Sequence, residues 1–214
     1  TNLNKKLISN SNYVLRKVLN SESSLEILKN FIEAILEVKI EEIKLNPYLE
    51  KKAKYLPHEE NFGIADVRIR TRENEEINVG IQFLDGIYYI QTKMLMYYAQ
   101  IHLNQLEYED NREFARTATI NLVDFEYFSS QKYDKVIRVQ SNEGNVQLEE
   151  LEMHVIELPK YICNNLDNIT AKEEWILYLK GCDNITLERI KQNNKNIKLL
   201  DELIEKYWHE EKME

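Results

Sequence analysis

The chain has 214 residues, of which 43% are hydrophobic and 30% charged, and its formal net charge is −9. This composition suits one globular domain with a sizeable core. The acidic balance gives no overall positive charge for non-specific nucleic-acid binding, although it is compatible with a local basic cleft. Two cysteines, Cys163 and Cys182, are too few for a disulfide framework, so we expect free thiols in a cytoplasmic protein. No apolar run approaches the ~20 residues that span a bilayer, so we expect no membrane partner.

The first part of the chain has helical periodicity. Apolar residues recur at helical intervals from Leu25 to Leu36, and the preceding "SSLE" (23–26) has the pattern of a capping box. We therefore predict a helix over about 24–37, with a shorter helix before it over 13–19.

Strand-like alternation begins after residue 63. The runs Ile64 to Arg70 and Ile77 to Phe83 alternate apolar and polar residues and are joined by a polar loop, which predicts an antiparallel hairpin. An apolar stripe predicts a long helix next, over about 87–107. The later predicted strands are 117–125, 133–139 and 151–157, of which the last two form a second hairpin with Gly144 in its loop.

The C-terminal part of the chain is expected to be helical. "TAKE" (170–173) is a second capping-box pattern, and it opens a helix that Gly181 ends. One further amphipathic helix is predicted from Thr186 to Trp208. A compositional break near 163–168 divides a mixed α/β core, residues 1–165, from a helical extension, residues 166–214, that packs on the core or on a partner subunit.

The first hairpin is a candidate site. Strand alternation places Asp66 on the face that also holds Gly80 and Gln82 on the second strand. A strand carboxylate beside another polar residue and a backbone carbonyl can hold Mg²⁺, and such an ion can activate water against a phosphodiester. The plainer interpretation is that Asp66 pairs with Arg68 or Arg70 on a solvated face. Gly80 is unusual there, because glycine weakens the interior of a strand.

Several segments, in a fixed order over about residues 12–165, carry a resemblance to a known family. They are "YVLRKVL" (13–19), "LNP" (45–47), "ADVRIRTRENEEINVGIQ" (65–82), "MLMYYAQIHLNQL" (94–106), "ATINLVDFEYF" (118–128) and "LEMHVIELPKY" (151–161). With the order of the elements, they resemble the PD-(D/E)XK nuclease superfamily, and more narrowly its branch of recombination-promoting nucleases or putative transposases. The resemblance implies a restriction-endonuclease-like α/β core, a mixed central sheet flanked by helices, with the C-terminal helical tail added to it.

The resemblance also implies an activity, metal-dependent hydrolysis of DNA, and a set of site residues. Asp66 would bind Mg²⁺ or Mn²⁺ together with the backbone carbonyl of Ile81, and Gln82 would position water or phosphate. Lys93, on the helix after the hairpin, and Arg68 would contact the DNA backbone. A homodimer would suit the cutting of two strands.

The chain departs from the family pattern at Gly80, where the family has a glutamate, and at Asn12, where it usually has an acidic residue. Mg²⁺ gives up its waters reluctantly and needs anionic ligands, so losing one carboxylate should cost on the order of 10³-fold or more in rate. Asp85 or Glu33 could supply a carboxylate, although Asp85 reads as a loop residue and Glu33 as solvent-facing. Two functions therefore stay open: an impaired endonuclease, or an inactive DNA-binding or protein-interaction module with the nuclease fold.

Overall fold

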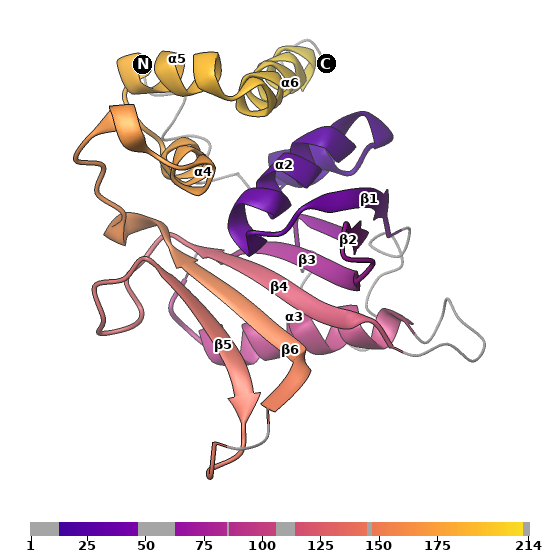
Figure 1. Ribbon diagram of the computed structural model, residues 1–214. Coiled ribbons are helices and arrows are strands. Elements are labelled where there is room, and N and C mark those ends of the chain that lie inside the picture. The colour runs from indigo at the N-terminus through magenta and orange to yellow at the C-terminus, as the bar shows by residue number, and fades with distance from the viewer. Residues whose placement is uncertain (1–12, 47–62, 85, 106–113, 145–146, 212–214) are drawn as a thin grey trace.

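The computed structural model describes residues 13–46, 63–84, 86–105, 114–144 and 147–211. At its centre is a six-stranded sheet in the order β1-β2-β3-β4-β6-β5, with helices on both faces (Figure 1). The strands are β1 (Ile40–Leu45), β2 (Ala65–Thr71), β3 (Glu76–Leu84), β4 (Arg116–Val123), β5 (Asp134–Gln140) and β6 (Gln147–Glu157).

The sheet is mixed. β1, β2 and β3 are antiparallel neighbours, whereas β3, β4 and β6 are parallel to one another, and β5 pairs antiparallel with β6. A parallel neighbour needs a crossover connection, and α3 provides it between β3 and β4. This mixed sheet flanked by helices is the restriction-endonuclease-like α/β fold that the resemblance predicts.

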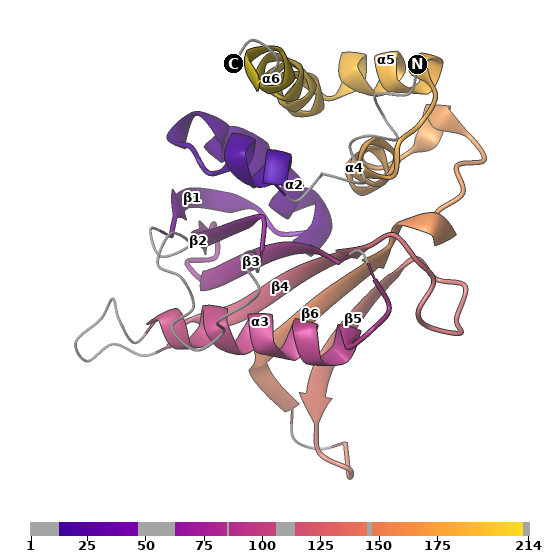
Figure 2. The ribbon, with the colours of Figure 1, turned by 180° about the vertical axis from the view of Figure 1, so that it is seen from behind.

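Helices cover both faces of the sheet. α2 and the C-terminal helices lie on one face and α3 lies on the other (Figures 1 and 2). The short helix over 13–19 precedes α2, as predicted. The longer helices are α2 (Leu25–Leu36), α3 (Ile90–Asn104), α4 (Ala171–Lys180), α5 (Asn184–Asn193) and α6 (Lys195–Glu211), and short 3₁₀ turns are η1 (Glu22–Ser24), η4 (Leu158–Lys160) and η5 (Leu166–Asn168).

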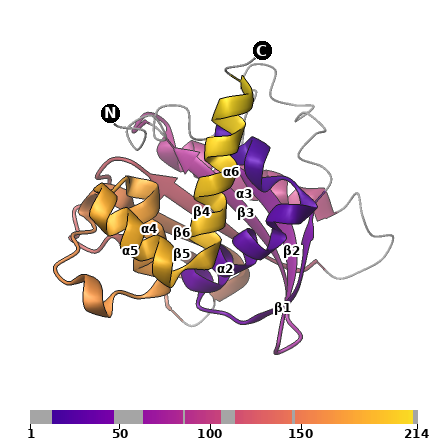
Figure 3. The same cartoon turned by 90° about the horizontal axis from the view of Figure 1, so that it is seen from above.

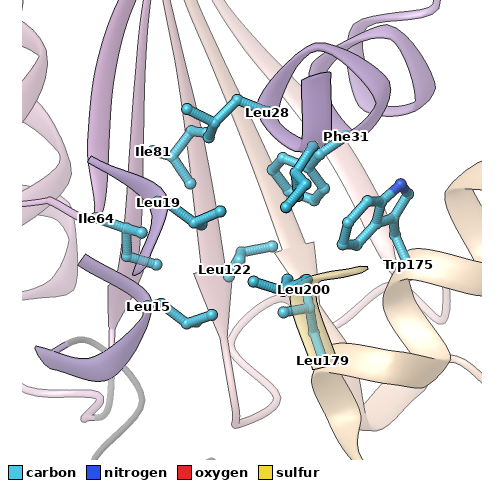
Figure 4. A pocket seen from close by; sticks show the side chains of 11 residues that line it. Leu15, Leu19, Leu28, Phe31, Ile64, Ile81, Leu122, Trp175, Leu179 and Leu200 are labelled. Carbon is cyan, nitrogen blue, oxygen red and sulfur yellow. The ribbon is translucent and has the colours of Figure 1, made fainter. Parts of the chain in front are cut away.

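The C-terminal helices share one hydrophobic core with the sheet. α4 and α6 lie beside α2 (Figure 3), and their buried side chains belong to the same apolar cluster as those of α2, β2, β3 and β4. An apolar cavity of about 20 Å³ remains where these layers meet (Figure 4). Ile81 and Leu122 line it from the sheet, Phe31 from α2, and Trp175 and Leu200 from α4 and α6. Such a small, wholly apolar space is expected to stay dry.

Several predicted elements are confirmed. Both hairpins form, with Gly144 at a φ of 74° in the second loop. The Thr170 hydroxyl accepts from the backbone N–H of Glu173 while the Glu173 carboxylate accepts from the N–H of Thr170, and Gly181 ends the helix at a φ of 84°. The predicted helix over 87–107 begins three residues later, at Ile90, because Tyr89 has a left-handed backbone conformation.

Two predictions in the helical regions are wrong. The capping box predicted at 23–26 does not form, because α2 begins after Ser24 without a side-chain cap; the Ser24 hydroxyl instead donates to the carbonyl of Val18 at 2.7 Å and so joins the first helix to the second. The single helix predicted from Thr186 to Trp208 is two helices, because Asn194 is extended. Its side-chain oxygen accepts from the backbone N–H groups of Asn196 and Ile197 and caps α6.

β1 was not predicted. Its sequence, "IEEIKL", alternates poorly and carries three charges, yet it pairs with β2 along the edge of the sheet. Within the described part of the chain, no helix has the length and apolar character needed to cross a membrane.

Candidate functional site

The hairpin of β2 and β3 places Asp66 directly opposite Gly80, as strand alternation predicts. Both residues lie on the face of the sheet that α3 covers, since a Cβ built on Gly80 points at Tyr97 and Ile101 of that helix. The opposite face of the same strands, with Val67, Val79 and Ile81 among others, belongs to the main apolar cluster. The candidate site is therefore a space between the sheet and α3.

Asp66 is fully buried. Its Oδ1 accepts a hydrogen bond from the side-chain amide of Asn46 at 3.3 Å, and its Oδ2 has no hydrogen-bond partner among the described residues. Burial disfavours the charged form and raises the pKa of Asp66 to about 7, although the side-chain amides of Asn46 and Asn104 oppose this shift. Asp66 does not pair with Arg68 or Arg70, which bind glutamates instead. At neutral pH this carboxyl is therefore about half protonated in the absence of a cation.

Gln82 is held by the neighbouring parallel strand. It lies in register with Asn121 of β4, and its side-chain amide donates to the Asn121 side-chain oxygen at 2.5 Å. The Asn121 amide in turn donates to the Thr119 hydroxyl at 3.2 Å and to the His154 carbonyl at 2.9 Å. Gln82 is 2% exposed. Its amide therefore belongs to a buried hydrogen-bond network of the sheet.

The carbonyl of Ile81 already has hydrogen-bond partners within the protein. It accepts the backbone N–H of Ile64 at 2.5 Å and lies 3.1 Å from the hydroxyl of Tyr97, which is also 3.2 Å from the carbonyl of Ala65. The Tyr97 hydroxyl has one proton, which the Ala65 and Ile81 carbonyls share. Tyr97 is fully buried, and the desolvation of its phenol raises its pKa well above the usual value, so it stays a donor.

Gly80 allows α3 to approach the sheet closely. A Cβ at position 80 would lie 2.9 Å from the Tyr97 ring, the Tyr97 hydroxyl and the Ile101 side chain. Gly63, at a φ of 95°, contacts the other side of the Tyr97 ring tip, and a side chain there would overlap it. Two glycines therefore leave the space that the Tyr97 side chain fills.

The residues present do not fit a divalent cation. Mg²⁺ needs near-octahedral oxygen ligands and anionic charge, whereas the described residues of this space offer one carboxyl, that of Asp66. Gly80 has no side-chain oxygen, and the Ile81 carbonyl accepts the N–H of Ile64 and faces the Tyr97 hydroxyl. In the described part of the chain, no group of three or more His, Cys, Asp or Glu side chains could hold a metal ion. Among the described residues, the Asp66 carboxyl alone does not make a Mg²⁺ site.

The structure locates three of the other candidate residues. Glu33 is on α2, across the sheet, where its carboxylate accepts the backbone N–H of Ile40 at 2.8 Å. Arg68 shares the face of Asp66 but forms an ion pair with Glu76 of the same hairpin. Lys93 is in the first turn of α3, half-buried. Asp85 and Asn12 lie outside the described residues. The roles assigned to Asp66, Ile81, Gln82, Lys93 and Arg68 stay predictions.

Sequence reasoning missed the contacts of Tyr97. The apolar stripe of the predicted helix indicates that Tyr97 and Tyr98 are buried, and both are. It does not show that the Tyr97 hydroxyl reaches the carbonyl of the residue expected to bind metal. The available signal was the glycine at position 80, since glycine inside a strand often marks the close approach of another group.

Comparison with known proteins agrees with the fold. The family model described as PD-(D/E)XK nuclease family transposase matches residues 10–214, which includes the C-terminal helices. No curated protein and no solved structure matches the chain. Because the family match spans nearly the whole sequence, and the mixed sheet has Asp66 on its second strand opposite position 80 of its third, the chain belongs to the PD-(D/E)XK nuclease family transposases.

Proposed function

We propose that this chain is a catalytically inactive member of its family, which keeps the nuclease fold as a binding module. The observation that carries the proposal is the position of Tyr97, whose hydroxyl lies on the Ile81 carbonyl and whose ring packs on Gly80. A metal ion and a glutamate would both need that space. Hydrogen-bonded packing between α3 and the sheet has replaced the metal centre.

A protein partner fits the surface better than DNA does. Several arginines of the sheet are already neutralised by ion pairs: Arg68 by Glu76, Arg70 by Glu41 and Glu42, and Arg116 by Glu75 and Glu152. Phosphate contacts from Lys and Arg supply most non-specific DNA affinity, and the chain as a whole has a net charge of −9. DNA, the substrate that the family description implies, is then the partner to test and exclude.

A residual endonuclease is the second candidate function. Asp66 and Gln82 are both retained, on adjacent strands and on one face. If α3 moved away from the sheet, Asp66 could bind Mg²⁺ or Mn²⁺ beside the Ile81 carbonyl. This function requires Tyr97 to leave its two carbonyl partners, which makes it the less favoured one.

Two further expectations are part of the proposal. The free thiols Cys163 and Cys182 suit the reducing cytoplasm. The chain is divided into a nuclease-like core over 1–165 and a helical extension over 166–214. The extension covers one face of the core, because α4 and α6 pack on α2.

Plasmid cleavage with Mg²⁺ or Mn²⁺ tests the loss of catalysis. We expect no nicking by the wild-type chain beyond that of Asp66→Ala. Gly80→Glu alone should also be inactive, because Tyr97 fills the space, whereas adding Tyr97→Ala to it gives the carboxylate room and is the variant in which cleavage can return. Nicking by the wild type that Asp66→Ala abolishes would instead establish the endonuclease.

DNA binding is measured on the same wild-type protein over a range of salt concentrations. A DNA-binding module should lose affinity linearly in log[salt] as counterions are released. We expect that this chain shows no DNA binding whose affinity falls with salt in this way. If the chain does bind DNA in a salt-dependent way, and Lys93→Glu removes this binding, the inactive module binds DNA and not only protein.

A further inference from the structure

The side of α3 that faces away from the sheet is apolar. Ile90, Met94, Tyr97, Tyr98 and Ile101 face the sheet and are buried. At 100° per residue, the opposite side carries a different set, which we call the outer face of α3. It consists of Thr92, Leu95, Met96, Ala99 and Leu103. Leu95 and Leu103 are each 56% exposed, and no helix or strand lies in front of α3 in Figure 2.

The outer face of α3 is also uncharged, in contrast to the rest of the molecule. The chain has 37 acidic residues, yet none lies between positions 86 and 104, where Lys93 is the one lysine. The exposed side of α6, by comparison, carries the pairs Lys198–Glu202 and Lys206–Glu210. An exposed helix in a soluble fold normally has charged residues on its solvent side. Their absence here indicates a surface that a partner covers.

Exposed aromatic side chains also lie at both ends of α3. Tyr88 and Tyr89, directly before the helix, are 80% and 79% exposed. Beyond the other end, Phe114 is 45% exposed and stacks on His102 with 5.0 Å between ring centroids. Exposed aromatic residues are enriched at protein interfaces. If two copies of α3 packed antiparallel, the tyrosine end of each helix would meet the Phe114 end of the other.

We propose that a second copy of this chain packs on the outer face of α3, with the two-fold axis passing between Met96 and Ala99. A two-fold interface sets a patch against itself, so a charged patch would repel its own copy. At a net charge of −9, an uncharged face is where two copies can approach at least electrostatic cost. Ala99 lies near the centre of the face, and a small side chain there allows a short distance between the helices. This dimer does not depend on the loss of catalysis.

Light scattering coupled to size-exclusion chromatography tests the dimer. We expect the wild-type chain to be a dimer at about 100 μM, well above the Kd of a stable complex. Leu95→Glu and Ala99→Glu each place two carboxylates in the interface, one from each copy, and should weaken dimerisation on the order of 100-fold or more. Ile185→Glu is the matched control, since Ile185 is 83% exposed on α5, and it should stay dimeric.

Disulfide trapping tests the position of the axis. In a background with Cys163→Ser and Cys182→Ser, Ala99→Cys should form a cross-linked dimer on oxidation, whereas Ile185→Cys should not. A monomeric wild type overturns the proposal. So does a dimer that Leu95→Glu and Ala99→Glu leave intact, or one in which Ala99→Cys cross-links no better than Ile185→Cys, because either result places the interface on another face.

Discussion

Tyr97 makes the contacts that, by family resemblance, a metal ion and a glutamate would make. Its hydroxyl lies on the carbonyls of Ala65 and Ile81, and its ring fills the space above Gly80. A glycine in a strand interior normally costs stability. Here the close packing of a fully buried tyrosine leaves no room for a side chain at this position.

Gly80→Ala should destabilise the protein by about 1–3 kcal/mol. The new Cβ would lie 2.9 Å from the Tyr97 ring and from Ile101, and overpacking of a dense core costs this much. Urea denaturation measures the change. Gly86→Ala is the matched control, because a Cβ there meets no atom within 4 Å, and it should change stability by less than ~0.5 kcal/mol. Equal effects of the two variants would contradict the packing of α3 on Gly80.

Asp66→Asn should stabilise the protein at pH 8 and much less at pH 5. The pKa of Asp66 is raised to about 7 in the folded state from 3.8. The folded protein therefore holds a proton that the unfolded chain releases, and this group's contribution to stability is lost as pH rises from about 4 to 7. Between pH values below 4 and above 7, the free energy of unfolding falls by on the order of 4 kcal/mol through this group.

The measurement is urea denaturation of both proteins at the two pH values. The exposed Glu26→Gln serves as the control for removing a carboxyl. The prediction is wrong if the stability difference between Asp66→Asn and the wild type does not grow between pH 5 and pH 8.

At the scale of residues, the sequence was informative about Asp66 and Gly80 but not about what lies between them. Strand alternation is a local rule, so it could place Asp66 and Gly80 on one face and opposite each other. The contact of Tyr97 with the Ile81 carbonyl joins residues 16 positions apart on different elements. It depends on how closely α3 approaches the sheet, which periodicity does not specify.

Secondary-structure elements with strong periodicity were predicted well, and those defined by tertiary contacts were not. The alternation of β2 and β3 and the capping box of α4 are confirmed. β1 was missed because its charged residues, which suit an exposed edge strand, hide the alternation. The break between α5 and α6 was missed because the helical spacing of Ile190, Ile197 and Leu200 continues across Asn194, although Asn is a preferred N-cap residue. The buried side chain of Asn194 also donates to Asn30 of α2, a contact far away in sequence.

Asn194→Ala should cost about 1–2 kcal/mol. It removes the cap from the backbone N–H groups of Asn196 and Ile197, and such caps contribute this much. Thermal unfolding followed by circular dichroism measures the change. The exposed Gln192→Ala, two residues earlier on α5, is the control and should be close to neutral. A neutral Asn194→Ala would mean that α6 begins without this cap.

In the whole molecule, the larger of two apolar clusters among the described residues joins the sheet, α2 and the C-terminal helices, and the smaller one packs α3 on β3, β4 and β6. The cavity in the larger cluster is lined from both sides, by Ile81 and Leu122 and by Trp175 and Leu200. The C-terminal helices are therefore part of the core, and we expect them to unfold together with the sheet.

Leu200→Ala should lower the free energy of unfolding by about 2–5 kcal/mol in a single cooperative transition. It enlarges an existing cavity, and the surrounding helices can collapse only in part. Leu199→Ala is the matched control, because Leu199 is 39% exposed on the same helix and Leu200 is 1% exposed. Two separate transitions, or equal effects of the two substitutions, would show that α6 does not share the core.

The central claim is that packing of Tyr97 has replaced the metal centre of this nuclease fold, and Mn²⁺ binding tests it most directly. Titration of the wild-type chain with Mn²⁺, followed by the electron paramagnetic resonance signal of the free ion, reports binding without any need for activity. Our account predicts that the wild-type chain and Asp66→Asn give the same Mn²⁺ titration, so that no saturable site depends on the Asp66 carboxylate. A one-to-one site that is present in the wild type and abolished by Asp66→Asn would contradict it.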